Sequence, residues 1–446
     1  MSHLNRNVST TINGALAESI DATVMQYYKP NEPGATIIVT RDGEIVFRKA
    51  YGMACIAKQQ LMTPETTLRL GSITKQFTAI SILMLAEKGQ LSVSDKIMQF
   101  LSDYPAQAEQ ITIEHLLTHT SGIVSFTEKN DFDTNIFKEV AVATMIDSFK
   151  DDPLEFKPGT AFSYNNSGYY LLGAIIEKIS GMSYARFVQQ HIFMPLGMNS
   201  TYYEGYELSP QRMAAGHTYS GSTFIPCDVI SVSQVYAAGG LVSNVNDMAV
   251  WDDAVASGKL ISAASWARAF TPYTLADGST CEYGYGWEIG TLQQRPMLAH
   301  GGGITGFMTF ALRLPEDKLF AAVLSNADFG IVDPEYITHK IAAIAIGKPL
   351  IDFEVIKLDT HVLDNYVGSY SINSSRKFLF WREADQLFFQ STGGDVTPVY
   401  AHSVTGFFIK NTLIHMDFVS DATGKVIKVV VHEHGEAKEN LRITAN

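Results

Sequence analysis

A serine and a lysine lie three residues apart in Gly71-Ser72-Ile73-Thr74-Lys75, where an apolar segment predicts a helix over Ser72–Lys88. Side chains three apart on a helix share one face, so the Lys75 amine can approach the Ser72 hydroxyl. That hydroxyl becomes a good nucleophile only when a base removes its proton, and a lysine is such a base only when its pKa falls below about 10.4. A capping serine beside a solvated lysine is the alternative, because Ser374–Lys377 repeats the spacing.

A tyrosine and an asparagine lie two residues apart in the segment Phe162-Ser163-Tyr164-Asn165-Asn166-Ser167-Gly168. In an extended loop such side chains point the same way, so a phenol can move protons while an amide orients a carbonyl or a lysine. The alternative is a capping loop, with Ser167 as the N-cap of a helix over Tyr169–Ile179.

Glycines follow a histidine in Ala299-His300-Gly301-Gly302-Gly303-Ile304-Thr305-Gly306. The G-x-G-x-x-G pattern within it is typical of dinucleotide binding only when a helix follows, whereas the next residues predict a strand, so we exclude a nucleotide site. Glycines leading into a strand instead let a ligand approach backbone N–H donors. His300 beside them can exchange protons near neutral pH.

Two pairs of histidines are close enough in the sequence to suggest metal ligands. His115 and His119 are four apart, but a glutamate precedes the first histidine, so the zinc-protease order is absent. His432-Glu433-His434 alternates like a strand, and the sequence nearby offers no third ligand. We therefore expect no metal and no cofactor.

Helices and hairpins must position these residues. Helical spacing from Ile12 to Tyr27 predicts a first helix. Two hairpins are predicted from Ala35–Arg41 with Glu44–Tyr51 and from Met308–Leu314 with Leu319–Ser325. Further helices are predicted over Thr112–Thr118, Ser183–Ile192, Asn246–Ala256 and about Pro334–Ile346. We expect an α/β (α+β) fold over 1–350, in which terminal helices flank an antiparallel sheet and a helical subdomain (roughly 76–235) is inserted.

The chain changes character after Gly347-Lys348-Pro349. Short β-rich segments are found at Tyr366–Ile372, Lys377–Trp381, Gln386–Gln390, Gly406–Lys410, Leu413–Val419 and Lys425–His432. Their regular spacing predicts a second domain over 351–446, a small antiparallel β-barrel.

The composition of the chain limits which kinds of partner and which cellular location we expect. The 446 residues are 46% hydrophobic and 18% charged, enough for two or three packed domains. A net charge of −13 disfavours nucleic acid and anionic lipid, and no apolar run approaches the ~18 residues of a membrane helix. The three cysteines fit neither a disulfide framework nor a metal site. The start lacks a secretory signal, so we expect a cytoplasmic protein, unless the numbering is that of a mature form.

Taken together and in order, Ser-x-x-Lys, Tyr-x-Asn and His-Gly-Gly resemble the serine β-lactamase and penicillin-binding-protein superfamily, in particular its class C β-lactamase, D,D-peptidase and esterase branch. The resemblance covers roughly residues 15–345. Supporting segments are Leu116-Leu-Thr-His-Thr-Ser-Gly122, Lys157-Pro-Gly-Thr160 and Leu171–Gly181. The tail resembles the lipocalin-like C-terminal domain of D-amino-acid-specific peptidases in this branch.

This resemblance implies a role for each site residue. Ser72 would be the acylated nucleophile, Lys75 its base partner, and Tyr164 the relay of protons to the leaving group and from water. Asn166 would orient the substrate and the lysine. The oxyanion would be held by the backbone N–H groups of Ser72 and Gly303.

His300 stands where many members have a lysine, and a neutral imidazole gives a substrate carboxylate no permanent cation. With the missing signal, this favours an intracellular serine hydrolase acting on a small molecule or on short peptides with D-residues. A carboxylesterase, a β-lactamase and a catalytically silent binding protein remain alternatives. Self-association through the C-terminal domain is a further hypothesis.

Overall fold

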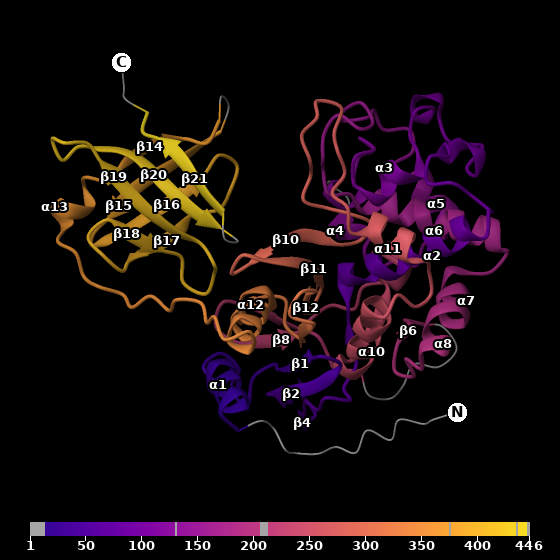
Figure 1. Cartoon of the computed structure of the whole chain (residues 1–446), viewed down its shortest axis with the longest axis horizontal. Helices are drawn as coiled ribbons and strands as arrows, with labels where there is room; N and C mark the ends of the chain where they lie inside the picture. The colour runs from indigo at the N-terminus through magenta and orange to yellow at the C-terminus, as the bar shows by residue number, and fades with distance from the viewer. Residues whose placement is uncertain (1–13, 130–131, 206–212, 374–375, 434–435, 444–446) are drawn as a thin grey trace. The chain divides into compact units, whose positions relative to one another are not determined.

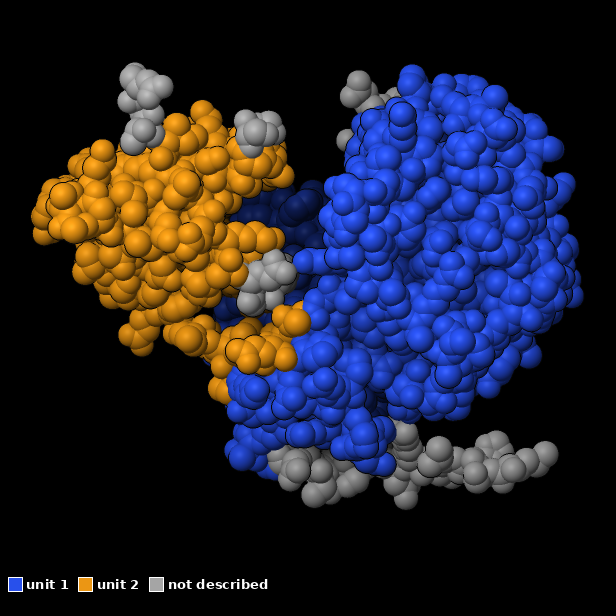
Figure 2. All heavy atoms as spheres, turned by 45° about the horizontal axis from the view of Figure 1, so that its top comes forward, with its two compact units in different colours: residues 1–290, 295–348 blue, residues 291–294, 349–446 orange. Residues whose placement is uncertain are grey.

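The computed structural model describes residues 14–129, 132–205, 213–373, 376–433 and 436–443. The chain divides into two compact units, coloured separately in Figure 2. The first comprises Met1–Gly290 and Arg295–Lys348, and the second comprises Thr291–Gln294 and Pro349–Asn446. In the described part of the chain, every helix is too short or too polar to cross a membrane.

A six-stranded sheet forms the centre of the first unit. Across the sheet the strands are β10 (Glu288–Leu292), β11 (Arg295–Ile304), β12 (Phe307–Leu314), β13 (Leu319–Ser325), β1 (Ala35–Arg41) and β2 (Glu44–Tyr51). β1 pairs with β13 antiparallel, from Ala35↔Ser325 to Arg41↔Leu319, so the two predicted hairpins join one sheet. Asp42 and Gly43 both have positive φ, +51° and +78°, which a two-residue hairpin turn requires.

Two terminal helices pack on this sheet. α12 (Pro334–Ala345) contacts β12 and β13, and α1 (Gly14–Val24) contacts α12 (Figure 1). α1 buries Ala17, Ile20 and Val24, which share one helix face. Of the predicted first helix, Ile12 lies outside the described residues, and the C-terminal end is at Val24 rather than Tyr27.

The helical part of the first unit is built around α2 (Thr74–Glu87) and α6 (Asn166–Ser180). α2 is buried on nearly every side, as expected of a helix surrounded by protein, and it packs against α6. The other helices are α3 (Ile113–Leu117), α4 (Phe132–Asn135), α5 (Val142–Asp147), α7 (Tyr184–Val188), α8 (Met194–Leu196), α9 (Tyr236–Gly239), α10 (Val245–Ala256) and α11 (Ala263–Ala269).

Short strands and a π-helical turn complete this unit. The strands are β3 (Met53–Cys55) with β4 (Gln60–Leu61), β5 (Leu68–Arg69) and β6 (Tyr202–Tyr203) on either side of β9 (Leu241–Ser243), and β7 (His217–Tyr219) with β8 (Phe224–Pro226). The predicted helix over Ser183–Ile192 is interrupted, because α7 ends at Val188 and a π-helical turn follows over Gln189–Phe193.

The second unit is an eight-stranded antiparallel sheet in which each strand pairs with the next along the chain. After α13 (Thr360–Leu363), the strands are β14 (Gly368–Ser371), β15 (Lys377–Glu383), β16 (Gln386–Ser391), β17 (Thr397–Ala401), β18 (Gly406–Phe408), β19 (His415–Ser420), β20 (Val426–Glu433) and β21 (Glu436–Leu441). A bridge between Tyr370 and Arg442 connects the first strand to the end of the last, which confirms a barrel-like sheet. Strands β17 and β21 were not predicted.

Candidate active site

Ser72 lies in a 3₁₀ turn, Gly71–Ile73, that leads directly into α2. Gly71 has φ +54°, and a Cβ at that position would lie 3.0 Å from the backbone nitrogen of Gly303 on β11. Only glycine accommodates both the left-handed backbone and the neighbouring strand. The nucleophile turn and the glycine run of β11 are therefore in close contact, although they are more than 200 residues apart in the sequence.

Lys75 is fully buried and touches the predicted nucleophile. Its Nζ lies 2.9 Å from Ser72 Oγ, 2.8 Å from Asn166 Oδ1 and 3.0 Å from the carbonyl oxygen of Ala238. Burial lowers the pKa of Lys75 well below its usual value, and the negative charge of Glu288 opposes this shift. A neutral amine held against a serine hydroxyl can accept its proton.

Tyr164 lies beside this pair. The Lys75 Nζ is 4.8 Å from the centroid of the Tyr164 ring and 5.6 Å from that of Tyr169. Burial raises the pKa of Tyr164 above its usual range, while a hydrogen bond with Ser72 acts in the opposite direction. The phenol therefore stays protonated and adjoins the serine, so it can give or pass on a proton.

Asn166 is the first residue of α6, so this helix begins three residues before the predicted Tyr169. The capping residue is Asn165, whose side chain accepts a hydrogen bond from the Gly168 amide at 2.7 Å. The prediction of Ser167 as N-cap is wrong, since its Oγ is buried within the helix and donates to the Val124 carbonyl. This cap orients Asn166 so that its Oδ1 faces Lys75. The Nδ2 of Asn166 donates to the Thr127 hydroxyl.

His300 lies on β11 itself, opposite Ala311 of β12, rather than on a loop before a strand. Its Nδ1 donates to the Gly301 carbonyl at 2.6 Å, so its Nε2 accepts from the Tyr283 hydroxyl at 2.7 Å. Burial and the nearby Lys75 lower the pKa of His300 to about 3, which keeps the imidazole neutral. Its ring centroid is 6.1 Å from that of Tyr164.

His119 also belongs to this cluster, a position that its spacing in the sequence did not predict. Its ring centroid lies 4.4 Å from that of Tyr164 and 4.6 Å from that of Tyr283. Its Nδ1 accepts from the Asn165 amide at 2.9 Å, whereas its buried Nε2 has no hydrogen-bond partner among the described residues. His115 instead caps its own helix by accepting from the Thr112 amide. The segment Leu116–Gly122, already noted for the resemblance, was the available signal for His119.

A cavity of ≈ 330 Å³ opens over the serine. Ser72, Asn166 and Gly303 line it, so three of the predicted residues share one space. Its other lining combines the hydroxyl groups of Thr127 and Thr305 with apolar side chains, which are those of Phe126, Phe132, Ile136, Ile230, Val235, Ala238 and Ile304. None of the described residues that line it carries a charge.

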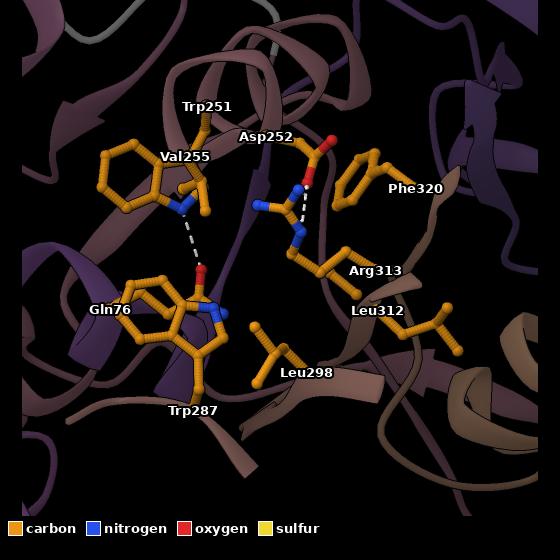
Figure 3. A pocket seen from close by; sticks show the side chains of 10 residues that line it. Gln76, Trp251, Asp252, Val255, Trp287, Leu298, Leu312, Arg313 and Phe320 are labelled. Carbon is orange, nitrogen blue, oxygen red and sulfur yellow. Dashed lines mark hydrogen bonds and ion pairs between the residues drawn. The ribbon is translucent and has the colours of Figure 1, made fainter. Parts of the chain in front are cut away.

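Gln76, the residue after Lys75, lines a different and much smaller cavity of ≈ 20 Å³ (Figure 3). There Gln76 Oε1 accepts from Trp251 Nε1 at 2.9 Å, and the Arg313 guanidinium pairs with Asp252 at 3.5 Å. Such a volume holds about one water molecule. We assign this region to anchoring α2 rather than to binding a substrate.

β10, with five residues, is shorter than the ten-residue β11, and a two-residue turn joins them. The end of β11 that contains His300 and Gly303 therefore extends past β10. A strand end that extends past the neighbouring strand can offer backbone N–H groups to a ligand.

The fold and this cluster define the class of the protein as a serine hydrolase of the β-lactamase and transpeptidase type. The family model described as Beta-lactamase matches residues 20–346, and the chain belongs to this family.

Three known proteins are similar to this chain in sequence or in fold. The chain is 30% identical over 433 residues to penicillin-binding protein 4* of Bacillus subtilis, covering 91% of this chain and 94% of that protein. The octameric penicillin-binding protein homologue of Pyrococcus abyssi superposes with a TM-score of 0.69 at 26% identity, over 96% of this chain and 99% of the other. A D-stereospecific amidohydrolase of Streptomyces, at 23% identity, shares the fold over 74% of this chain and 99% of its own, with a TM-score of 0.62.

Proposed function

We propose that the chain hydrolyses an amide bond in short peptides with a D-residue, through an acyl-enzyme on Ser72. The observation that carries this proposal is the 2.9 Å contact between Ser72 Oγ and a fully buried Lys75 whose pKa is lowered. The D-stereospecific amidohydrolase named above, and the structurally similar D-amino acid amidase of Ochrobactrum anthropi, support the substrate class.

Acylation starts with proton transfer from the Ser72 hydroxyl to the neutral Lys75 amine. The Ser72 oxygen then attacks the carbonyl carbon, and the carbonyl oxygen takes up negative charge. The N–H groups of Ser72 and Gly303 stabilise that oxyanion, because donors already in place need no rearrangement. Tyr164 delivers its proton to the leaving nitrogen as the C–N bond breaks and takes up the proton that Lys75 received, which leaves an ester on Ser72, a neutral Lys75 and a released amine.

Deacylation uses the same groups in reverse. Water loses a proton toward Tyr164 and Lys75 while its oxygen attacks the ester carbonyl, and the Ser72 oxygen leaves and recovers a proton. The product is a carboxylic acid. Asn166 keeps the Lys75 amine oriented in both halves through its 2.8 Å contact.

The uncharged cavity, which has apolar side chains along part of its lining, and the neutral His300 favour an uncharged acyl group with an apolar or aromatic side chain. They also favour, as a second candidate, a carboxylesterase acting on small acyl esters. They disfavour a β-lactamase that depends on a cation for the penicillin carboxylate.

Parallel turnover assays separate these activities. We expect hydrolysis of a D-phenylalanyl anilide, with much slower hydrolysis of the L-isomer. Turnover of a short-chain nitrophenyl ester without either anilide would establish the esterase instead. Intact-mass analysis after fluorophosphonate treatment tests the silent alternative, because a binding protein would gain no mass on Ser72.

We also propose that the chain forms a homo-oligomer, supported by the octameric relative that matches it along 96% of its length. Native mass spectrometry of the full chain tests this. A mass equal to the monomer's 49.1 kDa would contradict it.

A further inference from the structure

Two histidines and an aspartate meet on the barrel of the second unit. His415 and Asp417 lie two residues apart on β19, and His432 on β20 is the direct cross-strand partner of His415. Met416 and Phe418, which alternate with them, are buried in the barrel core. Since side chains alternate along a strand, His415 and Asp417 face outward. His432, opposite His415, lies on the same outer face.

The spacing of these side chains suits a small cation. One ligand atom from each of the three residues lies within 4.8 Å of the others, and His432 Nε2 is 3.2 Å from Asp417 Oδ2. Two ligands about 2.1 Å from a tetrahedral zinc ion are about 3.4 Å apart. The two imidazole rings are parallel within 1°, with centroids 4.3 Å apart. The donor atoms are therefore close enough to share one small cation.

An ion pair alone does not account for the arrangement. Asp417 and His432 suffice for such a pair, whereas His415 adds a second imidazole to the same position. The Phe353 ring lies 5.3 Å from the His415 ring and shields one side of the cluster. On the other side the cluster is open to solvent, with the His432 and Asp417 side chains 30% and 45% exposed.

We propose that His415, Asp417 and His432 bind one Zn²⁺ ion, with water as the fourth ligand. Two imidazoles and one carboxylate are donors that zinc prefers, and an open position suits a site reached from solvent. The ion joins β19 to β20 and so stabilises the barrel. The triplet His432-Glu433-His434 was expected to bind no metal, and its His434 lies outside the described residues. The other ligands come from β19, which the spacing in the sequence did not reveal.

Zinc titration of the full chain tests the site. The protein is stripped with EDTA, dialysed into metal-free buffer and titrated with ZnCl₂, with bound zinc measured by mass spectrometry and calorimetry. We expect one zinc per chain and a rise of about 5 °C in the unfolding midpoint at saturation. His415→Asn and Asp417→Asn each weaken binding at least about tenfold. Both residues lie on the outer face, so circular dichroism should show folded variants.

Two matched controls locate the effect. His361→Asn changes an exposed histidine of the same unit, and Ser72→Ala removes the proposed nucleophile. Both should bind zinc as the parent does, so failure of the proposed function and failure of this site give different results. Absence of zinc binding by the parent, or equal binding by the parent and both ligand variants, overturns the proposal.

Discussion

The two units of this protein treat their polar side chains in opposite ways. The first buries a lysine and two histidines around its candidate nucleophile, with Lys75 0% exposed and His119 and His300 each 1% exposed. The second fills its barrel with aromatic and aliphatic residues such as Tyr370, Phe380 and Phe418, and presents its histidine cluster on the outer face.

This difference between the units shows that burial has two separate effects, one on pKa values and one on stability. An ionisable group taken out of water loses solvation, so its neutral form becomes favoured. In the first unit this cost lowers the pKa values of Lys75 and His300 and makes a neutral amine available beside Ser72. In the barrel, burial of apolar side chains contributes to stability alone. Substitutions in the first unit should therefore lower activity, whereas substitutions in the barrel should lower the free energy of unfolding.

The largest effect is expected for Lys75→Met. This change removes the base while keeping a long side chain, and kcat/KM should fall about 10⁴-fold or more, as for other residues that activate a serine. Lys428→Met, on a surface ion pair of the barrel, is the matched control and should leave activity unchanged. A loss below tenfold for Lys75→Met would show that another group deprotonates Ser72.

Phe418→Ala tests the barrel by its stability. Phe418 is 3% exposed, and removal of a buried aromatic ring leaves a cavity that costs about 3–5 kcal/mol. Val419→Ala, at the next, partly exposed position of β19, should cost far less. Denaturant unfolding followed by circular dichroism measures both, and equal costs would contradict the inward and outward assignment on β19.

Tyr164→Phe should lower kcat about 10²-fold with little change in stability, because it removes one hydroxyl that transfers protons. Tyr219→Phe, at an exposed tyrosine, is the control. A loss of less than threefold for Tyr164→Phe would assign the proton relay elsewhere, with the unassigned His119 as the next residue to test.

The smallest effect is expected for Glu439→Gln. The Lys428–Glu439 pair is short, at 2.6 Å, but Glu439 is 62% exposed. Such surface pairs contribute about 0–1 kcal/mol, and salt screens them. The free energy of unfolding should differ little between the parent and Glu439→Gln, at low salt and at high salt. A loss of more than about 2 kcal/mol would contradict the contrast between the units.

Much of the fold was predictable where local signals agree with the tertiary structure. The bounds of β1, β2 and β13 match their predictions, because alternating β-branched residues and the Asp42-Gly43 turn act locally. β17 was missed because Pro398 interrupts its pattern, and β21 because Glu436–Leu441 is largely polar. Both depend on pairing with neighbouring strands rather than on their own sequence.

The candidate site was predictable as a set of residues but not as a geometry. The spacing of Ser72 and Lys75 indicates a contact, and the family resemblance implies that Asn166 orients the lysine, yet nothing in the sequence reports that the Ala238 carbonyl also accepts from it. The role of Asn165 as cap and the position of His119 depend on a loop folding back on α6. Contacts of this kind arise from tertiary packing, which a single sequence does not encode in any local pattern.

The pH dependence of Ser72 acylation tests the central claim most directly. Only the neutral amine accepts the serine proton, so the rate of fluorophosphonate labelling should rise with pH and level off once Lys75 is deprotonated. Because the pKa of Lys75 is lowered well below 10.5, and His300 and Tyr164 titrate outside the neutral range, we expect one inflection well below 10.5. Mass analysis should place the label on Ser72 in the parent and find none in Ser72→Ala. An inflection near 10.5, or labelling that survives in Ser72→Ala, would contradict the account.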